Sequence, residues 1–153
     1  MDAEKFTKKS LEVIESCEKL AYEYNNQELT QAHLMYALVT VEDSLIAKLL
    51  TNMGINMDAF TGECEKLVAN RPKVSGGQLF TSPEFSKALI QAEKEAKQMG
   101  DDYISVEHIF LGLLEKADKD IKRVINAYGI TRGKFLEVLA NIRGNRKVES
   151  DNP

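Results

Sequence analysis

The two histidines, His33 and His108, are the side chains best suited by type to bind a metal ion or to transfer a proton. Each stands three residues after a potential helix N-cap residue, Thr30 for His33 and Ser105 for His108. No acidic residue or cysteine recurs beside both histidines at the spacing of a zinc site. We therefore predict that each imidazole folds back over the first turn of its helix, and we expect no metal site.

The remaining chemically reactive side chains also favour a structural role. Cys17 and Cys64 are too few for a disulfide scaffold and are predicted to be buried, inert thiols. The acidic residues Asp101, Asp102 and Glu107 flank the expected start of a helix, where the helix dipole stabilises carboxylates. The sequence contains no GxxxxGK[ST], GxSxG, HExxH or CxxC motif. We therefore expect neither an enzyme nor a bound cofactor in this chain.

Composition predicts a globular domain and excludes several classes of partner. Of the 153 residues, 43% are hydrophobic and 29% are charged, which is unlike a disordered chain. The net charge is −4, and neither half of the chain is basic enough to bind nucleic acid. No stretch is apolar enough to cross a membrane, and the first 25 residues lack a secretory signal. We expect a cytoplasmic protein that binds neither nucleic acid nor membrane.

The elements that must position these side chains are duplicated within the chain. Residues 6–70 align with residues 81–145 at an offset of 75 residues without gaps, and His33 falls on His108. The other identical pairs are Glu18/Glu93, Lys19/Lys94, Ala21/Ala96, Leu38/Leu113, Asp43/Asp118, Ile46/Ile121, Gly54/Gly129, Ile55/Ile130, Phe60/Phe135 and Asn70/Asn145. The chain is therefore predicted to consist of two copies of one unit.

Apolar residues at helical spacing predict four helices in each unit. The expected N-cap residues of the second, third and fourth helices are Thr30, Asp43 and Asn56. Leu50, Gly54 and Ile55 have the spacing of a Schellman helix stop, which recurs at the equivalent positions of the second unit. Strand signals are absent, so we predict an all-α fold.

Two polar segments set the expected boundaries. The first, Arg71-Pro-Lys-Val-Ser-Gly-Gly-Gln78, is predicted to join the units, and Ser82 and Pro83 then start the next helix. After Ile142 the chain becomes polar and aperiodic. The predicted organisation is one domain over 1–143, comprising repeat one (1–70), a linker (71–80) and repeat two (81–143), with 144–153 starting a flexible linker.

Three apolar residues lie off the predicted apolar stripes, namely Leu11 and Tyr22 on the first helix and Ile90 on its counterpart. Two duplicated units must pack face to face, and the seam between them is a natural groove for an apolar peptide. Two interpretations remain open: the off-stripe residues contribute to such a groove, or they close the seam.

The chain resembles the Clp N-terminal domain, a double four-helix unit found at the front of Clp ATPases. The stretches that carry the resemblance are Phe6-Thr7, Leu29-Thr-Gln-Ala-His-Leu34, residues 71–78, Tyr103-Ile-Ser-Val-Glu-His108, residues 142–148 and Asp151-Asn-Pro153. Residues 71–78 and the final Asp-Asn-Pro resemble the ClpB branch of the family in particular.

The resemblance implies one compact domain of two tandem, pseudo-twofold-related four-helix repeats. It also implies a parent protein that is a hexameric ring ATPase, which threads polypeptides out of aggregates and works with the DnaK system. This chain would be its substrate-binding domain, a monomer when isolated, with unfolded or aggregated polypeptides as partners.

The resemblance also implies site residues. Residues implicated in substrate handling by the family match Thr7, Asp101 and Glu107. Combined with the off-stripe positions, this gives the hypothesis of a groove rimmed by these three residues, with an apolar floor formed partly by Leu11 and Ile90.

Two alternatives remain. The first is a ClpC- or ClpA-type domain that docks adaptors or tagged substrates for a protease. ClpC domains usually carry a glutamate before the histidine in both repeats, whereas this chain has Glu107 in the second and Ala32 in the first. The other alternative is a free-standing regulatory Clp-repeat protein without an ATPase, against which the polar tail argues mildly. The sequence beyond Pro153 would discriminate a ClpB-type from a ClpC-type parent protein.

Overall fold

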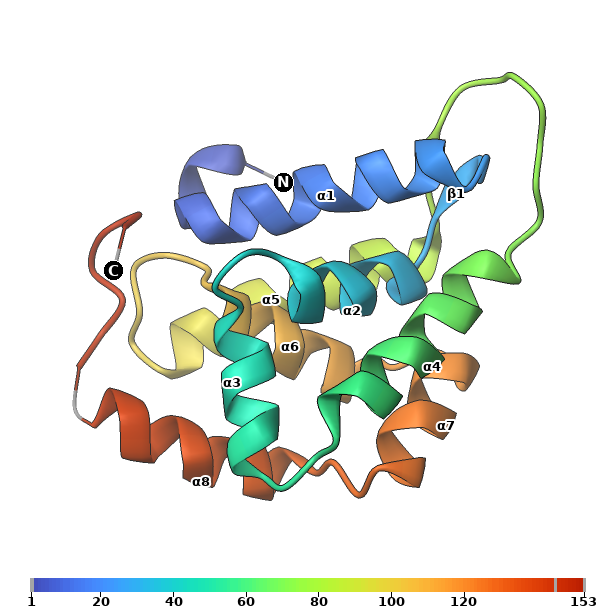
Figure 1. Cartoon of the computed structure of the whole chain (residues 1–153). Coiled ribbons are helices and arrows are strands. Elements are labelled where there is room, and N and C mark those ends of the chain that lie inside the picture. Colours follow the sequence, from blue (N-terminus) through green and yellow to red (C-terminus); the bar gives the residue numbers. More distant parts are fainter. Residues whose placement is uncertain (1, 145, 153) are drawn as a thin grey trace.

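The computed structural model describes residues 2–144 and 146–152. Met1, Asn145 and Pro153 lie outside the described residues, and with them the Asn70/Asn145 pair and the last residue of the predicted linker. The helices are η1 (Ala3–Lys5, a 3₁₀ turn), α1 (Lys8–Glu23), α2 (Gln31–Thr40), α3 (Leu45–Asn52), α4 (Met57–Ala69), α5 (Pro83–Gln98), α6 (Val106–Glu115), α7 (Lys119–Ala127) and α8 (Arg132–Arg143). Two short strands, β1 (Glu28–Leu29) and β2 (Phe80–Thr81), complete the elements (Figure 1).

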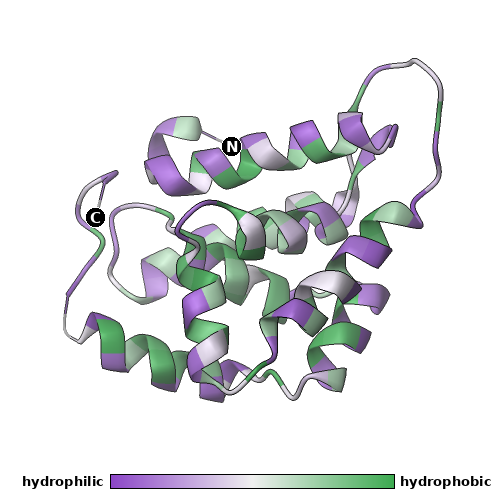
Figure 2. Cartoon of the chain, viewed as in Figure 1, coloured by the Kyte–Doolittle hydropathy of each residue, from purple (hydrophilic) through white to green (hydrophobic). Residues whose placement is uncertain are grey.

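The prediction of four helices in each unit is confirmed. Helices α1, α2, α3 and α4 correspond to α5, α6, α7 and α8, and their starting residues keep the offset of 75 to within one residue. Helix α2 packs on α1, α3 and α4 of its own unit and on α5, α6 and α7 of the other. Because the helices of the two units interleave in this way, they bury their apolar faces in one shared core (Figures 1 and 2).

Short parallel pairings join the two units in a pseudo-twofold pattern. Leu29 of β1 pairs with Thr81 of β2, and an isolated bridge pairs Phe6 with Ile104. The two pairs are equivalent, because Leu29 aligns with Ile104 and Phe6 aligns with Thr81 at the offset of 75. In each pair, the segment just before the first helix of one unit lies beside the segment just before the second helix of the other unit. The expectation that the chain has no strands is wrong for these positions, because a two-residue strand is too short to show alternating hydrophobicity. The all-α class is confirmed.

The helix ends follow the sequence signals with one exception. The Schellman stops are confirmed by hydrogen bonds from Ile55 N–H to Leu50 O (3.1 Å) and from Ile130 N–H to Ile125 O (2.9 Å). The caps at Asn56 and Ser82 are confirmed as well.

The predicted cap at Asp43 is wrong, because Ser44 is the N-cap of α3. The Ser44 hydroxyl oxygen accepts the N–H of Ala47 (2.9 Å), whereas Asp43 lies in a turn with a φ of +55°. Its counterpart Asp118 does cap α7 and accepts the N–H of Ile121. The turn before α3 therefore contains one residue more than the aligned turn before α7.

Cys17 and Cys64 are free and fully buried, as predicted. Burial raises the pKa of the Cys17 thiol and raises that of Cys64 to about 12, so neither is a ready nucleophile. No helix among the described residues is long and apolar enough to cross a lipid bilayer.

Candidate functional site

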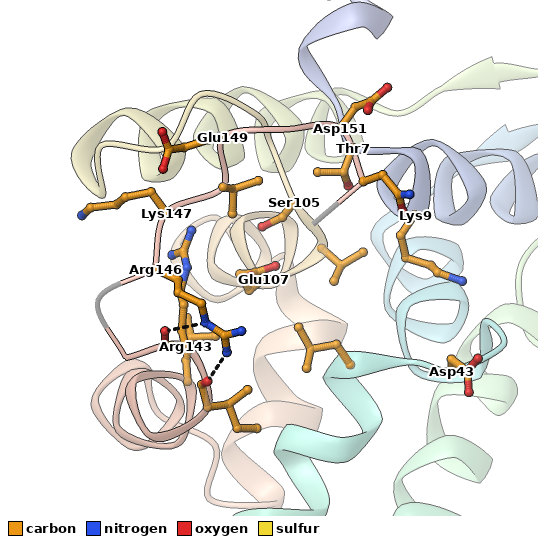
Figure 3. A pocket seen from close by; sticks show the side chains of 16 residues that line it. Thr7, Lys9, Asp43, Ser105, Glu107, Arg143, Arg146, Lys147, Glu149 and Asp151 are labelled. Atoms are coloured by element: carbon orange, nitrogen blue, oxygen red, sulfur yellow. Dashed lines mark hydrogen bonds between the residues drawn. The ribbon is translucent and has the colours of Figure 1, made fainter.

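A cavity of about 600 Å³ opens at one seam between the two units (Figure 3). The first unit contributes the start of α1 and the start of α3, and the second unit contributes α6 and α8. Residues 146–152 form a further wall. The apolar lining consists of Leu45, Val106, Leu139, Ile142 and Val148.

Charged side chains of both signs surround this apolar surface. The bases are Lys9, Arg143, Arg146 and Lys147, and the acids are Asp43, Glu107, Glu149 and Asp151. The rim is therefore balanced in charge and does not select a strongly charged ligand. An apolar centre with a mixed polar rim is suited to a polypeptide segment.

Thr7 lies at the cavity and joins the two units through its backbone. It is the N-cap of α1, and its hydroxyl oxygen accepts the N–H of Ser10 (3.2 Å). Its own N–H donates to Ile104 O (3.0 Å), and the Ser10 hydroxyl donates to the same oxygen. Thr7 therefore holds the start of α1 against the second unit and so shapes the cavity mouth.

Glu107 also lies at the cavity, as the second residue of α6. The residue is largely buried, and the positive end of the helix dipole stabilises a carboxylate at this position. Together with Thr7, it is one of the two predicted rim residues that the structure brings to this cavity.

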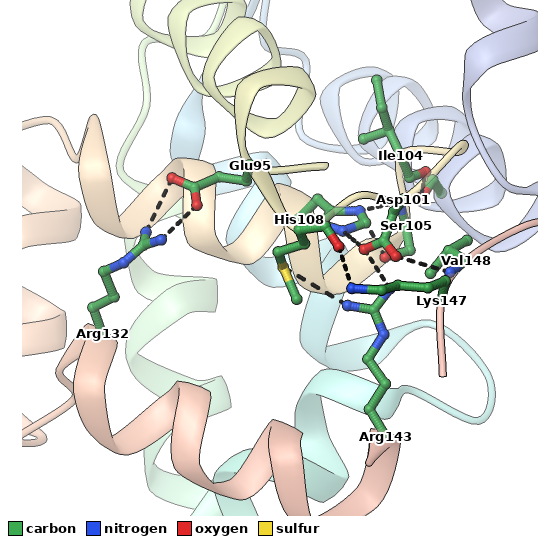
Figure 4. A network of polar contacts seen from close by, with 11 residues as sticks. Glu95, Asp101, Ile104, Ser105, His108, Arg132, Arg143, Lys147 and Val148 are labelled. Atoms are coloured by element: carbon green, nitrogen blue, oxygen red, sulfur yellow. Dashed lines mark hydrogen bonds and ion pairs between the residues drawn. The ribbon is translucent and has the colours of Figure 1, made fainter. Parts of the chain in front are cut away.

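Asp101 does not line the cavity but belongs to a polar network with His108, Arg143 and Val148 (Figure 4). Its buried carboxylate forms an ion pair with Arg143 and accepts hydrogen bonds from His108 Nε2–H (2.7 Å) and Val148 N–H (2.9 Å). Burial alone would raise the pKa of Asp101, but these three partners outweigh it and lower the pKa below its usual range. The predicted rim position is thus corrected: Asp101 holds wall residues in place.

The capping role predicted for both histidines is confirmed. His33 Nδ1 accepts the N–H of Thr30 (3.0 Å), and His108 Nδ1 accepts the N–H of Ser105 (2.8 Å). Since Nδ1 accepts in both rings, Nε2 carries the proton, and that of His33 donates to Asn26 Oδ1 (2.9 Å).

Burial is the largest influence on both imidazoles. It lowers the pKa of His33 to about 4, and nearby Arg71 adds to the effect. It also lowers the pKa of His108, although the negative charges of Glu107 and Asp101 oppose that shift. Both histidines are therefore built to stay neutral in the folded domain.

Leu11 and Ile90 do not line the cavity. Both side chains are exposed, on α1 and α5 respectively, as is Tyr22. The floor expected from Leu11 and Ile90 is made instead by the five apolar lining residues given above. Any contribution of Leu11 or Ile90 to binding remains a prediction.

None of the five apolar lining residues and no part of residues 146–152 is predicted from the sequence to belong to the site. One signal could have pointed to part of it, namely the positions at which the two units differ. Val106 aligns with Gln31, Glu107 with Ala32, and Arg143 with a valine. These differences fall at this cavity.

The described residues include no group of three or more His, Cys, Asp or Glu side chains placed to hold a metal ion. Among the described residues that line the cavity, none forms the arrangement of a nucleophile with an adjacent base.

Comparisons with known proteins identify the family to which the chain belongs. A family model described as the Clp repeat (R) N-terminal domain matches residues 5–128. The chaperone protein ClpB of Clostridium tetani is 38% identical over 158 aligned residues, which cover 100% of this chain and 18% of that protein. The chain therefore spans less than a fifth of the length of this curated relative.

Solved structures share the fold. The Hsp104 N-terminal domain from Candida albicans matches with a TM-score of 0.84 and 21% identity, covering 97% of both chains. The N-terminal domain of the chaperone ClpD from Arabidopsis thaliana matches with a TM-score of 0.70 and 20% identity, covering 94% of this chain and 98% of that one. The duplicated helical units, the paired histidine caps and the family model together show that this chain belongs to the Clp repeat N-terminal domain family.

Proposed function

We propose that the chain is the substrate-binding N-terminal domain of a ClpB-type AAA+ chaperone, and that the seam cavity holds exposed apolar segments of unfolded or aggregated polypeptides. The observation that carries the proposal is the cavity itself, with its apolar lining and its charge-balanced rim. The 38% identity to ClpB over the whole chain supports the choice of branch.

The area of the apolar lining sets the expected strength of binding. Burial of apolar surface contributes about 25 cal/mol per Å², and association must also offset the ordering of a flexible segment. A cavity of this size therefore supports weak binding. Weak binding suits a domain that passes segments on to an ATP-driven threading ring.

The wider context belongs to the same proposal. The parent protein would be a hexameric Clp ATPase that works with the DnaK system, and this domain would contribute no catalysis of its own. Two free, buried thiols fit a reducing compartment, so the cytoplasm is the proposed location.

Two isoleucines of similar exposure provide a matched test of the site. Ile142 lines the cavity and is 41% exposed, whereas Ile90 lies off it and is 50% exposed. The probe is a fluorescent peptide of about twelve residues that alternates leucine with serine, with an all-serine peptide as its control. We expect Ile142→Ser to weaken peptide binding by about tenfold and Ile90→Ser to leave it within about twofold.

Backbone amide shifts during an NMR titration would locate the bound peptide in the same samples. Shifts around Thr7, Val106 and Glu107 support the seam cavity. Loss of binding in Ile90→Ser, with unchanged binding in Ile142→Ser, would place the site on the face that includes Ile90 and Leu11 and would overturn the choice of this cavity. The absence of any binding at millimolar peptide would overturn the proposal.

The alternative is a ClpC- or ClpA-type domain that docks adaptors or tagged substrates. The ClpD N-terminal domain has the same fold, which is the observation that keeps this alternative in view. Only the second unit offers a glutamate before its histidine, because Ala32 occupies the aligned position in the first. If the domain does not bind the leucine–serine peptide, this alternative becomes the preferred function.

A further inference from the structure

The last described segment of the chain, residues 146–152, builds one wall of the seam cavity. It supplies six of the sixteen lining residues, namely Arg146, Lys147, Val148, Glu149, Asp151 and Asn152. We call this segment the tail wall. Its polar sequence predicts the start of a flexible linker, whereas in the structure it contacts both units.

Three points of contact hold the tail wall in place. In the middle, Val148 is 4% exposed, its N–H donates to the Asp101 carboxylate (2.9 Å), and its carbonyl accepts the N–H of Asp102 (2.8 Å). On one side, Lys147 Nζ donates to Met99 O (2.7 Å). On the other side, Asp151 O accepts the N–H of Lys8 (2.8 Å) at the start of α1.

The first unit docks its own post-helix segment in the same manner. After α4, Pro72 O accepts a hydrogen bond from the Asn26 side chain (3.2 Å), and Val74 N–H donates to Asn25 O (2.8 Å). Asn26 aligns with Asp101, so the docking place is part of the duplicated design. The segment of the first unit lines a pocket of about 200 Å³, and that of the second unit lines the cavity of about 600 Å³.

We propose that the tail wall is part of the peptide-binding site, so that occupation of the cavity and docking of the tail stabilise each other. This inference rests on the function proposed above. One buried side chain and a few hydrogen bonds must offset the entropy of ordering seven residues, so the docked and released states lie close in free energy.

Linkage makes the effect reciprocal. A peptide that contacts the tail wall binds the docked state better, and it must therefore hold the tail against the domain by the same factor. In a longer chain, the segment after residue 152 would then leave the domain in one fixed direction while cargo is bound. Peptide capture would thereby be coupled to the orientation of the domain.

Two valines provide the test. Val148→Ser removes the buried side chain of the tail wall, and Val74→Ser is the matched control, since Val74 lies in the post-helix segment of the first unit and is 40% exposed. With the same leucine–serine peptide, we expect Val148→Ser to weaken binding by about five- to tenfold and Val74→Ser to change nothing. Hydrogen exchange of the Val148 amide in the wild-type domain should slow when peptide is added.

The outcomes separate this inference from the proposed function. If the wild-type domain binds the peptide and Val148→Ser binds it equally or more tightly, the tail wall is not part of the site, although the cavity remains one. If the wild-type domain binds no peptide, the proposed function itself fails. Should Val148→Ser unfold, Lys147→Met removes the bond to Met99 O together with one charge at the cavity, and unchanged peptide affinity in that variant would equally overturn the inference.

Discussion

The two units meet at two seams related by the pseudo-twofold axis, and Gln31 distinguishes them. At the first seam, Gln31 is fully buried, and its Nε2 donates to Glu84 O (2.9 Å) and Lys116 O (2.8 Å). Its Oε1 accepts the N–H of Asp118 (2.8 Å). At the second seam, Val106 occupies the aligned position and cannot form such bonds, and the cavity opens there.

The histidine centres behind the two seams differ in a matching way. In the first unit, His33 donates to the neutral Asn26, and a buried valine, Val68, lies at the equivalent of Arg143. In the second unit, His108 donates to the charged Asp101, which Arg143 balances. The charge and its counter-charge are thus present together or absent together, because a lone buried charge would be too costly. The neutral centre lies beside a pocket of about 200 Å³, whereas the charged centre holds the tail wall beside the cavity of about 600 Å³.

The largest expected effect comes from converting the charged centre into the neutral one. Arg143→Val alone leaves the Asp101 carboxylate buried without its counter-charge, and we expect a loss of about 3–5 kcal/mol in the free energy of unfolding. The double variant Asp101→Asn with Arg143→Val reproduces the pair found in the first unit. It should recover most of that loss, to within about 1 kcal/mol of wild type.

Urea unfolding of the wild type, both single variants and the double variant measures this coupling directly. If the losses of the two single variants add up in the double variant, the neutral centre cannot replace the charged one. The correspondence between the two histidine centres would then be wrong.

The next effect concerns the bridged seam. Gln31→Val places the second unit's residue in the first seam and removes all three hydrogen bonds made by the Gln31 side chain. We expect a loss of about 2–3 kcal/mol in the free energy of unfolding, because buried backbone groups lose their partners. Val39→Ala at the end of the same helix is a control for general weakening of α2, with a cost set by lost apolar volume.

Xenon or small apolar probes detected by NMR would show whether the Gln31→Val seam also opens. A variant as stable as wild type, with no new probe site, would mean that the glutamine does not close this seam.

The smallest effect is the pH dependence of the first histidine centre. Since burial lowers the pKa of His33 to about 4, the unfolded state binds a proton more readily, and stability falls as the pH drops from the ordinary histidine pKa toward 4. Between pH 7 and about pH 4.5 we expect His33 to account for a loss of roughly 2 kcal/mol.

His33→Gln keeps a side chain able to complete a capping box but cannot titrate, so this share of the pH dependence should disappear. Urea unfolding at the two pH values measures it. If wild type and variant lose the same stability over this range, His33 is not the group responsible.

Local signals were readable from the sequence for a physical reason. The helix stops at Gly54 and Gly129 and the histidine caps depend on residues three to five positions apart, and the duplication is visible because the two copies align without gaps. Asp43 shows the limit of such reading, because two adjacent residues could both cap α3 and the turn before it selected Ser44.

The site itself depended on contacts between residues far apart in the chain. The family resemblance implies a rim of Thr7, Asp101 and Glu107, of which Thr7 and Glu107 line the cavity. The sequence does not show that Asp101 turns inward to Arg143 and Val148, or that residues 146–152 return to the domain. A single buried valine and a few long-range hydrogen bonds hold that polar segment in place. No hydrophobic periodicity in the sequence predicts these contacts. By itself, the sequence determined two helical units and their ends, since those follow from local propensity and capping. The tertiary structure alone decided which seam is bridged and which contains the cavity of about 600 Å³. That depends on whether the residue at the start of the second helix of each unit, Gln31 or Val106, can hydrogen-bond to the opposite unit.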